Sequence, residues 1–167
     1  QSLRIHSERF VPSRSQKRIR QLNQDLELVL SYDDKPEYYQ LYERYIRERH
    51  RDGSMYPPAP EQLNSMLNCS WLKVRLLKQY YNDQLVALTI VDETDLAFSA
   101  VYTFYQPAVS RFSPGILAVL YLLQCAAQQQ KDWLYLGYQI DDCQKMAYKA
   151  AFLPQQRFIQ GQWHSFG

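Results

Sequence analysis

Two tyrosines and two lysines near the C-terminus are the residues best suited to bind an anionic ligand. Tyr135 and Tyr138 lie on either side of Gly137 in a short aromatic stretch that predicts a strand. A buried tyrosine needs a partner for its hydroxyl, and the glycine lets a ligand or another backbone approach closely. Lys145 and Lys149 follow in a predicted helix, where a spacing of four places both on one face. Together they predict a pocket for an anionic group beside an aromatic wall.

A second anion site is predicted where a long apolar helix begins. Arg111 precedes Pro114 and Gly115 at this start. The first amides of a helix have no partner within it and bind anions readily. A coenzyme A site would be expected to have several glycines here, and this chain has only Gly115. A terminal RNA phosphate is the alternative ligand, and a helix start with a solvent-facing arginine is the third interpretation.

Aromatic residues also gather near the end of a predicted strand. Tyr102, Phe104 and Tyr105 come shortly before Pro107. Proteins read single-stranded RNA ends by stacking and hydrogen bonding, and each stacked base contributes roughly 1–3 kcal/mol. The same pattern occurs in the core of ordinary sheets. The sequence therefore leaves two interpretations, a surface for a terminal adenine and a packed core.

Polar residues after an aromatic helix form the main constellation in the first half of the chain. His50, Asp52 and Gly53 follow that helix directly. A histidine at a helix C-terminus can interact with the helix dipole without any catalytic role. Asp92, at the end of a predicted strand, is a candidate for acid–base chemistry and is otherwise a turn residue. Both sites keep a functional and a structural interpretation.

The net charge of +2 hides a basic N-terminus. Residues 1–20 contain six lysines or arginines and one glutamate, so the rest of the chain is slightly acidic. A basic arm over residues 1–25 fits a phosphate-rich partner, and serine hydroxyls between the arginines also contact phosphates. A solvated, partly disordered N-terminus is the alternative. The phosphate-binding candidates are Ser13, Arg14, Ser15, Lys17 and Arg18.

The cysteines and histidines do not predict a metal site. Cys69, Cys125 and Cys143 are widely spaced, and the three histidines are scattered. Unpaired cysteines are typical of a reducing cytoplasm. No stretch reaches the roughly 18 apolar residues of a membrane span, so we expect no membrane partner. Gln1 as the first residue suggests a chain cut from something longer.

Hydrophobic periodicity predicts one α+β domain over residues 26–167, with a mixed central sheet flanked by helices. Short polar turns predict that the three middle strands form an antiparallel meander. The element order is that of a GNAT-like acyltransferase, in which the fourth and fifth strands separate to admit a donor. The predicted strands are 26–32, 71–80, 84–92, 96–105 and 133–140, with two short strands in the tail. The predicted helices are 36–53, 61–67, 115–130 and 142–151.

Several blocks resemble the C-terminal catalytic domain of the aminoacyl-tRNA–protein transferases, the leucyl- and arginyl-transferases of the N-degron pathway. The resemblance covers nearly the whole chain and is nearer to the bacterial type. It implies a GNAT-like fold, an aminoacyl-tRNA co-substrate, no cofactor, and acceptor proteins that begin with Asp or Glu. The donor would be leucine, or arginine as the alternative. The blocks are SRSQKRIR (13–20), YERYIRERHRDGSM (42–55), FSAVYTFYQP (98–107), RFSPG (111–115), WLYLGYQIDDCQKMAYK (133–149) and FLPQQRFIQGQW (152–163).

The resemblance implies roles for residues in these blocks. The candidate catalytic residues are Tyr102, Tyr138 and Lys145 from these blocks, together with Asp92, which lies outside them at the end of a predicted strand. The implied readers of the acidic N-terminus are Arg14, Arg111, Lys145 and Lys149. The implied aminoacyl-tRNA contacts are Ser13, Arg14, Ser15, Lys17, Arg18, Phe104, Tyr105, Arg111, Gly115, Tyr135 and Gly137. Further motif residues are Arg49, His50, Asp52, Gly53, Met146 and Tyr148.

The implied chemistry asks little of an enzyme beyond alignment. An amine that attacks an aminoacyl ester forms a more stable amide, and orientation supplies most of the acceleration. A weak base or a tyrosine relay suffices, because an α-amino group has a pKa near 7.7–8.0. Two alternatives remain, a CoA-dependent N-acetyltransferase and a non-catalytic binding module for tRNA or N-degrons. Relatives also begin with a cysteine-rich segment without a counterpart here, and many have a serine-leucine-glycine version of the RFSPG loop.

Overall fold

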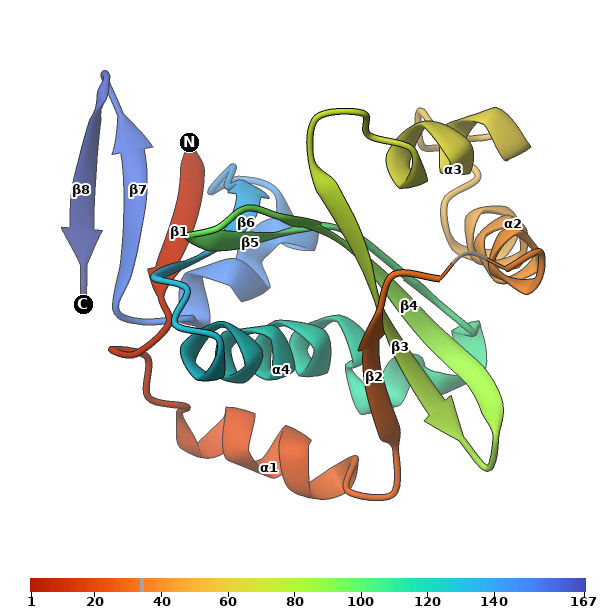
Figure 1. Cartoon of the computed structure of the whole chain (residues 1–167), viewed down its shortest axis with the longest axis horizontal. Helices are drawn as coiled ribbons and strands as arrows, with labels where there is room; N and C mark the ends of the chain where they lie inside the picture. The colour runs from red at the N-terminus through yellow and green to blue at the C-terminus, as the bar shows by residue number, and fades with distance from the viewer. Residues whose placement is uncertain (34) are drawn as a thin grey trace.

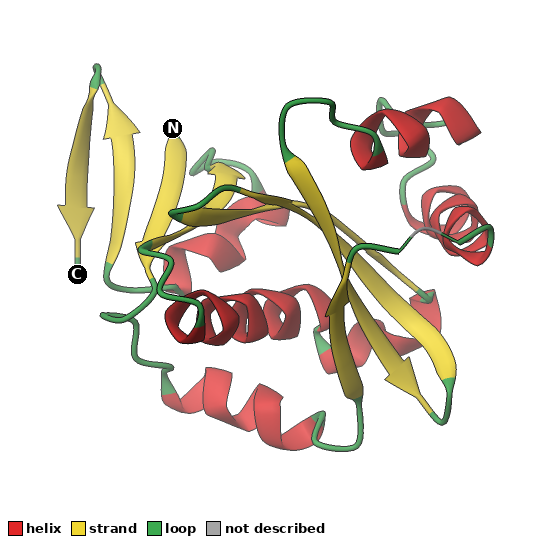
Figure 2. Cartoon of the chain, viewed as in Figure 1, coloured by secondary structure: helices red, strands yellow, loops and turns green. Residues whose placement is uncertain are grey.

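One mixed sheet of eight strands runs through residues 1–33 and 35–167, the part that the computed structural model describes apart from the Lys145 side chain (Figure 1, Figure 2). The strand order is β2-β3-β4-β5-β6-β1-β7-β8. The strands are β1 (Ser2–His6), β2 (Glu27–Ser31), β3 (Lys73–Tyr81), β4 (Gln84–Glu93), β5 (Ala97–Tyr105), β6 (Trp133–Tyr138), β7 (Gln155–Ile159) and β8 (Gln162–Phe166). The α-helices are α1 (Arg14–Leu22), α2 (Glu37–Arg49), α3 (Pro60–Leu67) and α4 (Pro114–Gln128), and the 3₁₀ helices are η1 (Pro107–Phe112) and η2 (Gln144–Ala151).

The sheet opens between β5 and β6. Strands β3 to β5 form the predicted antiparallel meander, and β2 extends it by pairing antiparallel with β3. β5 then runs parallel to β6, but only Ala97–Ser99 pairs with Trp133–Tyr135. Beyond this point β5 continues to Tyr105, while β6 pairs antiparallel with β1. The predicted separation of these two strands is therefore confirmed.

The first 25 residues are built into the fold, where the sequence suggested a separate basic arm. Leu3 and Ile5 on β1 are fully buried, and β1 lies between β6 and β7. Ser13 caps α1 and forms a capping box with Gln16. Arg20 donates from Nη2 to the carbonyl of Leu120 at 2.9 Å, which joins α1 to α4. Two apolar residues among basic and polar ones are a weak strand signal, so the periodicity of β1 was missed.

The predicted α-helix over 142–151 is instead the 3₁₀ helix η2. Two buried glutamines from other elements bind the last carbonyls of η2: Gln16 Nε2 donates to Ala151 O, and Gln155 Nε2 donates to Ala150 O, each at 3.1 Å. A 3₁₀ helix has three residues per turn, so residues four apart do not share a face. The spacing argument that joined Lys145 to Lys149 is therefore wrong.

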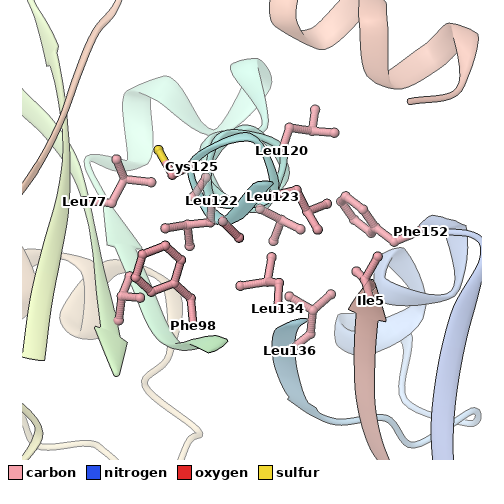
Figure 3. Close-up of a cluster of buried hydrophobic side chains, with 14 of the residues drawn as sticks. Ile5, Leu77, Phe98, Leu120, Leu122, Leu123, Cys125, Leu134, Leu136 and Phe152 are labelled. Atoms are coloured by element: carbon pink, nitrogen blue, oxygen red, sulfur yellow. The ribbon is translucent and has the colours of Figure 1, made fainter. Parts of the chain in front are cut away.

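Two cores lie on opposite faces of the sheet. The larger packs α4 against β1, β5 and β6, with Phe98, Leu122 and Leu134 among its buried side chains (Figure 3). The smaller packs α2 and α3 against β4 and β5, and Tyr42 and Phe104 are fully buried there. Helix α1 lies against α4, outside the sheet (Figure 1). Among the described residues, no helix has both the length and the apolar character needed to cross a bilayer.

Candidate active site

A pocket of about 640 Å³ opens where β5 and β6 separate. Seven elements enclose it: the end of α2, strands β4, β5 and β6, the 3₁₀ helices η1 and η2, and the start of α4. This is the predicted site of donor entry. Its lining includes eight residues that the sequence singled out, namely Arg49, His50, Tyr102, Tyr105, Gly115, Met146, Tyr148 and Lys149.

One wall of the pocket is aromatic and comes from α2 and β5. The Tyr45 ring lies 4.8 Å from the rings of both His50 and Tyr105, measured between centroids. The Arg49 guanidinium carbon lies 5.9 Å from the centre of the Tyr105 ring. Burial raises the pKa of Tyr102 to about 12, and it also raises the pKa of Tyr45. At neutral pH these two phenols are therefore protonated and able to donate hydrogen bonds.

The opposite wall comes from η2 and β6. Lys149 donates from Nζ to the carbonyl of Tyr138 at 2.6 Å. Burial lowers the pKa of Lys149 and raises the pKa of Tyr148. Met146 and Leu136 add apolar surface to this wall. The result is a half-buried ammonium group at the edge of an apolar surface.

The N-terminus of α4 forms the end of the pocket. Ser113 has a left-handed backbone (φ 54°), and Pro114 occupies the first helical position. Gln79, fully buried on β3, donates from Nε2 to the carbonyl of Pro114 at 2.9 Å and fixes the start of the helix. Nothing lies within 4 Å of where a Cβ on Gly115 would be. A ligand can therefore approach this helix start closely, and the fifteen-residue α4 favours a negative charge there.

The floor of the pocket is apolar. It is formed by Ile116, Ala118 and Val119 from α4 and by Ala100 from β5. Within the described part of the chain, no aspartate or glutamate lines this pocket. The cations Arg49 and Lys149 lie on its rim without a carboxylate in the lining. The pocket therefore suits a ligand with an apolar group and a negative charge.

Some predicted site residues lie outside this pocket. Phe104 is fully buried against Tyr42, with ring centroids 5.5 Å apart, so the base-stacking interpretation is wrong for this residue. Asp92 pairs with Ser99 across β4 and β5, and burial raises its pKa. Arg111 is exposed and stacks on Phe112 at 4.6 Å from guanidinium carbon to ring centre. These side chains do not line the pocket.

The remaining predicted residues are spread over the surface. Tyr138 is 69% exposed, and Gly137 beside it has a positive φ of 70°. Tyr135 accepts a hydrogen bond from Arg4 on the neighbouring strand. The side chain of Lys145 lies outside the described residues. The exposed phosphate-binding candidates at α1 are Ser13, Arg14, Ser15, Lys17 and Arg18, and the exposed or half-buried turn after α2 contains Asp52 and Gly53.

Sequence reasoning missed part of the lining. Tyr45, a buried residue of α2 that the sequence analysis did not single out, also lines the pocket. Thr89 and Thr103 share a hydrogen bond of 2.9 Å between their hydroxyls, in the middle of two strands that otherwise bury apolar side chains. Two threonines within otherwise apolar strands are a sequence signal that could have indicated a polar site there. Ile116 and Leu136 look like ordinary core residues, and no sequence signal separates them from the core.

Solved structures share this fold at very low sequence identity. L-PGS from Bacillus licheniformis matches with a TM-score of 0.61 and 9% identity, over 86% of this chain and 46% of that one. The C-terminal domain of a protein from Agrobacterium fabrum matches with a TM-score of 0.59 and 11% identity, over 81% and 45%. Together with the separated strands, these matches define a GNAT-like fold, as the sequence predicted.

The sequence itself identifies the family. The profile described as "Arginine-tRNA-protein transferase, C terminus" matches residues 37–159. The chain belongs to this family of aminoacyl-tRNA–protein transferases and is an enzyme of the aminoacyltransferase type. A protein from Aeromonas hydrophila named aspartate/glutamate leucyltransferase is 58% identical, over 98% of this chain and 68% of that protein. Its namesake from Pseudoalteromonas atlantica is 47% identical, over 98% and 71%. The resemblance found in the sequence is confirmed.

Proposed function

We propose that this domain transfers leucine from leucyl-tRNA to the N-terminal amine of proteins that begin with Asp or Glu. The amine attacks the ester carbonyl of the aminoacyl-tRNA, an amide bond forms, and the 3′-terminal ribose oxygen leaves with a proton. The names of the bacterial relatives support both the donor and the acceptor. The observation that carries the proposal is a pocket with an apolar floor, cations at its rim and no carboxylate in its described lining.

The apolar floor favours leucine over arginine as the donor. Ile116, Val119, Leu136 and Met146 offer a leucyl side chain a surface of matching polarity. An arginyl donor would place a guanidinium group in this region, and burial of an unpaired charge is strongly unfavourable. None of the described lining residues could neutralise it with a carboxylate.

The rim cations favour an acidic side chain on the acceptor. Of the four cations that the family resemblance proposes for this role, Lys149 lines the pocket. Arg49 faces the pocket from α2, where its planar guanidinium can bind a carboxylate through two parallel hydrogen bonds. We assign both residues to the carboxylate of the N-terminal Asp or Glu. Arg14 and Arg111, which lie outside the pocket, are then available to the tRNA.

The protonated phenols and the α4 helix start provide polar contacts for the reaction. Negative charge develops on the carbonyl oxygen of the ester during attack, and preorganised hydrogen-bond donors stabilise such charge. Tyr102 can donate to this oxygen because its pKa of about 12 keeps it protonated. Gly115 at the start of α4 offers backbone amides to a phosphate of the tRNA. The reaction needs no covalent intermediate and no cofactor.

The biological setting follows from the proposed chemistry. A leucine added to an N-terminal Asp or Glu would mark the acceptor for degradation by the N-degron pathway. Cys69, Cys125 and Cys143 are all unpaired, which supports a reducing cytoplasm as the place of action. The single glycine at the α4 start gives little support to the CoA-dependent alternative, and a binding module without activity is the remaining one.

The test is a transfer assay with labelled aminoacyl-tRNA. Leucyl-tRNA and arginyl-tRNA are each offered with peptides that begin with Glu or Lys. We expect leucine to move to the Glu peptide only. Transfer of arginine would refute the donor assignment, and transfer to the Lys peptide would refute the acceptor assignment. A longer version that includes the cysteine-rich segment of the relatives is tested in parallel, and no transfer by either version would refute the proposed activity.

A further inference from the structure

Aromatic side chains and one arginine cover a sheet face that α4 does not cover. Along β1 and β6 the residues alternate between buried and half-buried. Leu3, Ile5 and Leu134 point into the core beneath α4 and are fully buried. Their neighbours Arg4 and Tyr135 therefore point to the opposite face, where they remain partly exposed. Figure 1 shows β7 and β8 at the end of the sheet far from α2 and α3.

Arg4 is held between two indole rings on this face. Its guanidinium carbon lies 3.8 Å from the centre of the Trp133 ring and 4.0 Å from that of Trp163. Its Nε donates to Gln156 Oε1 at 2.9 Å, and its Nη1 donates to the Tyr135 hydroxyl at 3.2 Å. Such a geometry fixes the direction in which the remaining N–H groups point, because a guanidinium is planar and rigid.

The groups that contact the Arg4 guanidinium are all uncharged. Its two hydrogen-bond acceptors are an amide oxygen and a phenol, and among the described residues no carboxylate forms an ion pair with it. A partly exposed arginine that is fully stacked but has no anionic partner is ready to bind an anion. Phosphate is an anion that arginine recognises well.

The aromatic surface continues beyond the arginine onto the terminal hairpin. The Phe158 ring lies 5.2 Å from Trp163, and Tyr135 lies 6.0 Å from it, measured between centroids. Phe158 is 42% exposed. Neighbouring strands lie about 4.8 Å apart, so the surface from β6 to β8 is about 14 Å wide. At about 3.4 Å per stacked base, this width holds a few bases.

This surface and the pocket share strand β6, whose residues point alternately to the two faces of the sheet. Leu136 on β6 lines the pocket, and Tyr135 next to it in the chain belongs to the aromatic face. A chain that leaves the gap between β5 and β6 on the sheet face opposite α4 would meet Tyr135 and Arg4 first and the hairpin aromatics next. Alternating phosphates and unstacked bases are the chemistry that an arginine within an aromatic row recognises.

We propose that this face, formed by Arg4, Trp133, Tyr135, Phe158 and Trp163, binds the single-stranded 3′ segment of the aminoacyl-tRNA. The occupant rests on the proposed function, since that reaction brings the RNA end to the neighbouring pocket. Arg4 contacts a phosphate, and the exposed rings of the hairpin stack on bases. Sequence recognition is not required, because every base has an aromatic face.

The test measures RNA binding without any transfer step. A labelled, uncharged single-stranded RNA with the tRNA 3′ sequence is titrated with the protein, and its fluorescence anisotropy gives Kd. We expect Phe158→Ala and Trp163→Ala each to raise Kd about 5- to 150-fold, the effect of losing one stacked base. Trp71→Ala removes an indole that is 81% exposed in the loop before β3 and should leave Kd within about twofold.

Two further variants keep the result interpretable. Trp163→Phe retains a ring and should bind the RNA nearly as tightly as the parent, even if Trp163→Ala unfolds the hairpin. Arg4→Gln should reduce the salt dependence of Kd, because one phosphate contact is lost. An unchanged Kd in folded Phe158→Ala would overturn the proposal, and so would equal binding of a blunt duplex. If the parent enzyme binds the RNA without transferring leucine, and Phe158→Ala and Trp163→Ala lose this binding, the result supports the proposed surface and refutes only the proposed donor chemistry.

Discussion

Arg49→Ala should remove selectivity for acidic acceptors while leaving the rest of the reaction in place. The side chain lies on the pocket rim, exposed at the end of α2 and 5.9 Å from the centre of the Tyr105 ring. An exposed ion pair contributes about 0.2–1 kcal/mol, and a hydrogen bond to a charged group contributes about 1.5–3 kcal/mol. For a partly exposed rim, we expect a loss of about 1–2 kcal/mol.

This loss corresponds to a decrease of about 5- to 30-fold in kcat/KM for a peptide that begins with Glu. A peptide that begins with Gln has nearly the same shape without the charge, so its slower transfer should hardly change. The assay is transfer of labelled leucine to the two peptides, with kcat/KM determined for each. The ratio of the two values isolates the carboxylate contact from any general loss of activity.

The matched control is Arg47→Ala on the same helix. Arg47 Nη2 lies 3.0 Å from Glu43 in an exposed ion pair, and Arg47 does not line the pocket. We expect its Glu-to-Gln ratio to equal that of the parent enzyme. If Arg49→Ala slows both peptides equally, the residue supports the pocket without recognising the acid. If kcat/KM changes for neither peptide, the assignment of Arg49 to the acceptor carboxylate is wrong.

Three further predictions concern stability and are checked by urea denaturation. Phe104→Ala should lower the free energy of unfolding by about 3–5 kcal/mol, because the ring is fully buried. A small decrease in this free energy together with weaker RNA binding would restore the base-stacking interpretation of Phe104. Gly137→Ala should cost about 1–2 kcal/mol through its positive φ alone, since nothing crowds the added Cβ. Asp33→Asn should cost about 1–2 kcal/mol, a value reduced for partial exposure, because Lys78 donates to Asp33 at 2.7 Å. That hydrogen bond holds the pKa of Asp33 well below its usual range, so the cost is full above about pH 4 and shrinks as the pH falls further.

Strong local periodicity made most of the fold predictable. The strands of the meander alternate or are uniformly apolar, and the short polar turns between them fix their order. Helix α4 has a proline at its start and apolar residues on nearly all sides, which matches its buried position. Strand β1 was missed because its neighbours come from the far end of the chain, and pairing over that separation leaves no local signal.

The candidate site was predictable only where its residues are unusual for their element. Tyr102 and Tyr105 were found because aromatic residues gather near the end of a strand, and Lys149 was found because it is a lysine close to an aromatic strand. Phe104 was misassigned because a one-dimensional pattern does not tell which face of β5 meets α2. The floor of the pocket could not be found, since an apolar residue in a cavity wall has the same sequence context as one in the core.

The position of β1 has a consequence for how this domain is made. Ser2 pairs with Tyr138 on one side and with Phe158 on the other. Within this domain, Ser2 must therefore wait for partners that leave the ribosome more than 130 residues later, about 7 to 26 s at typical elongation rates. During that interval β1 has no partner strand, and the pocket wall on β6 has not yet been synthesised. The domain can complete its active site only after residues 133–159, which form β6, η2 and β7, have been synthesised.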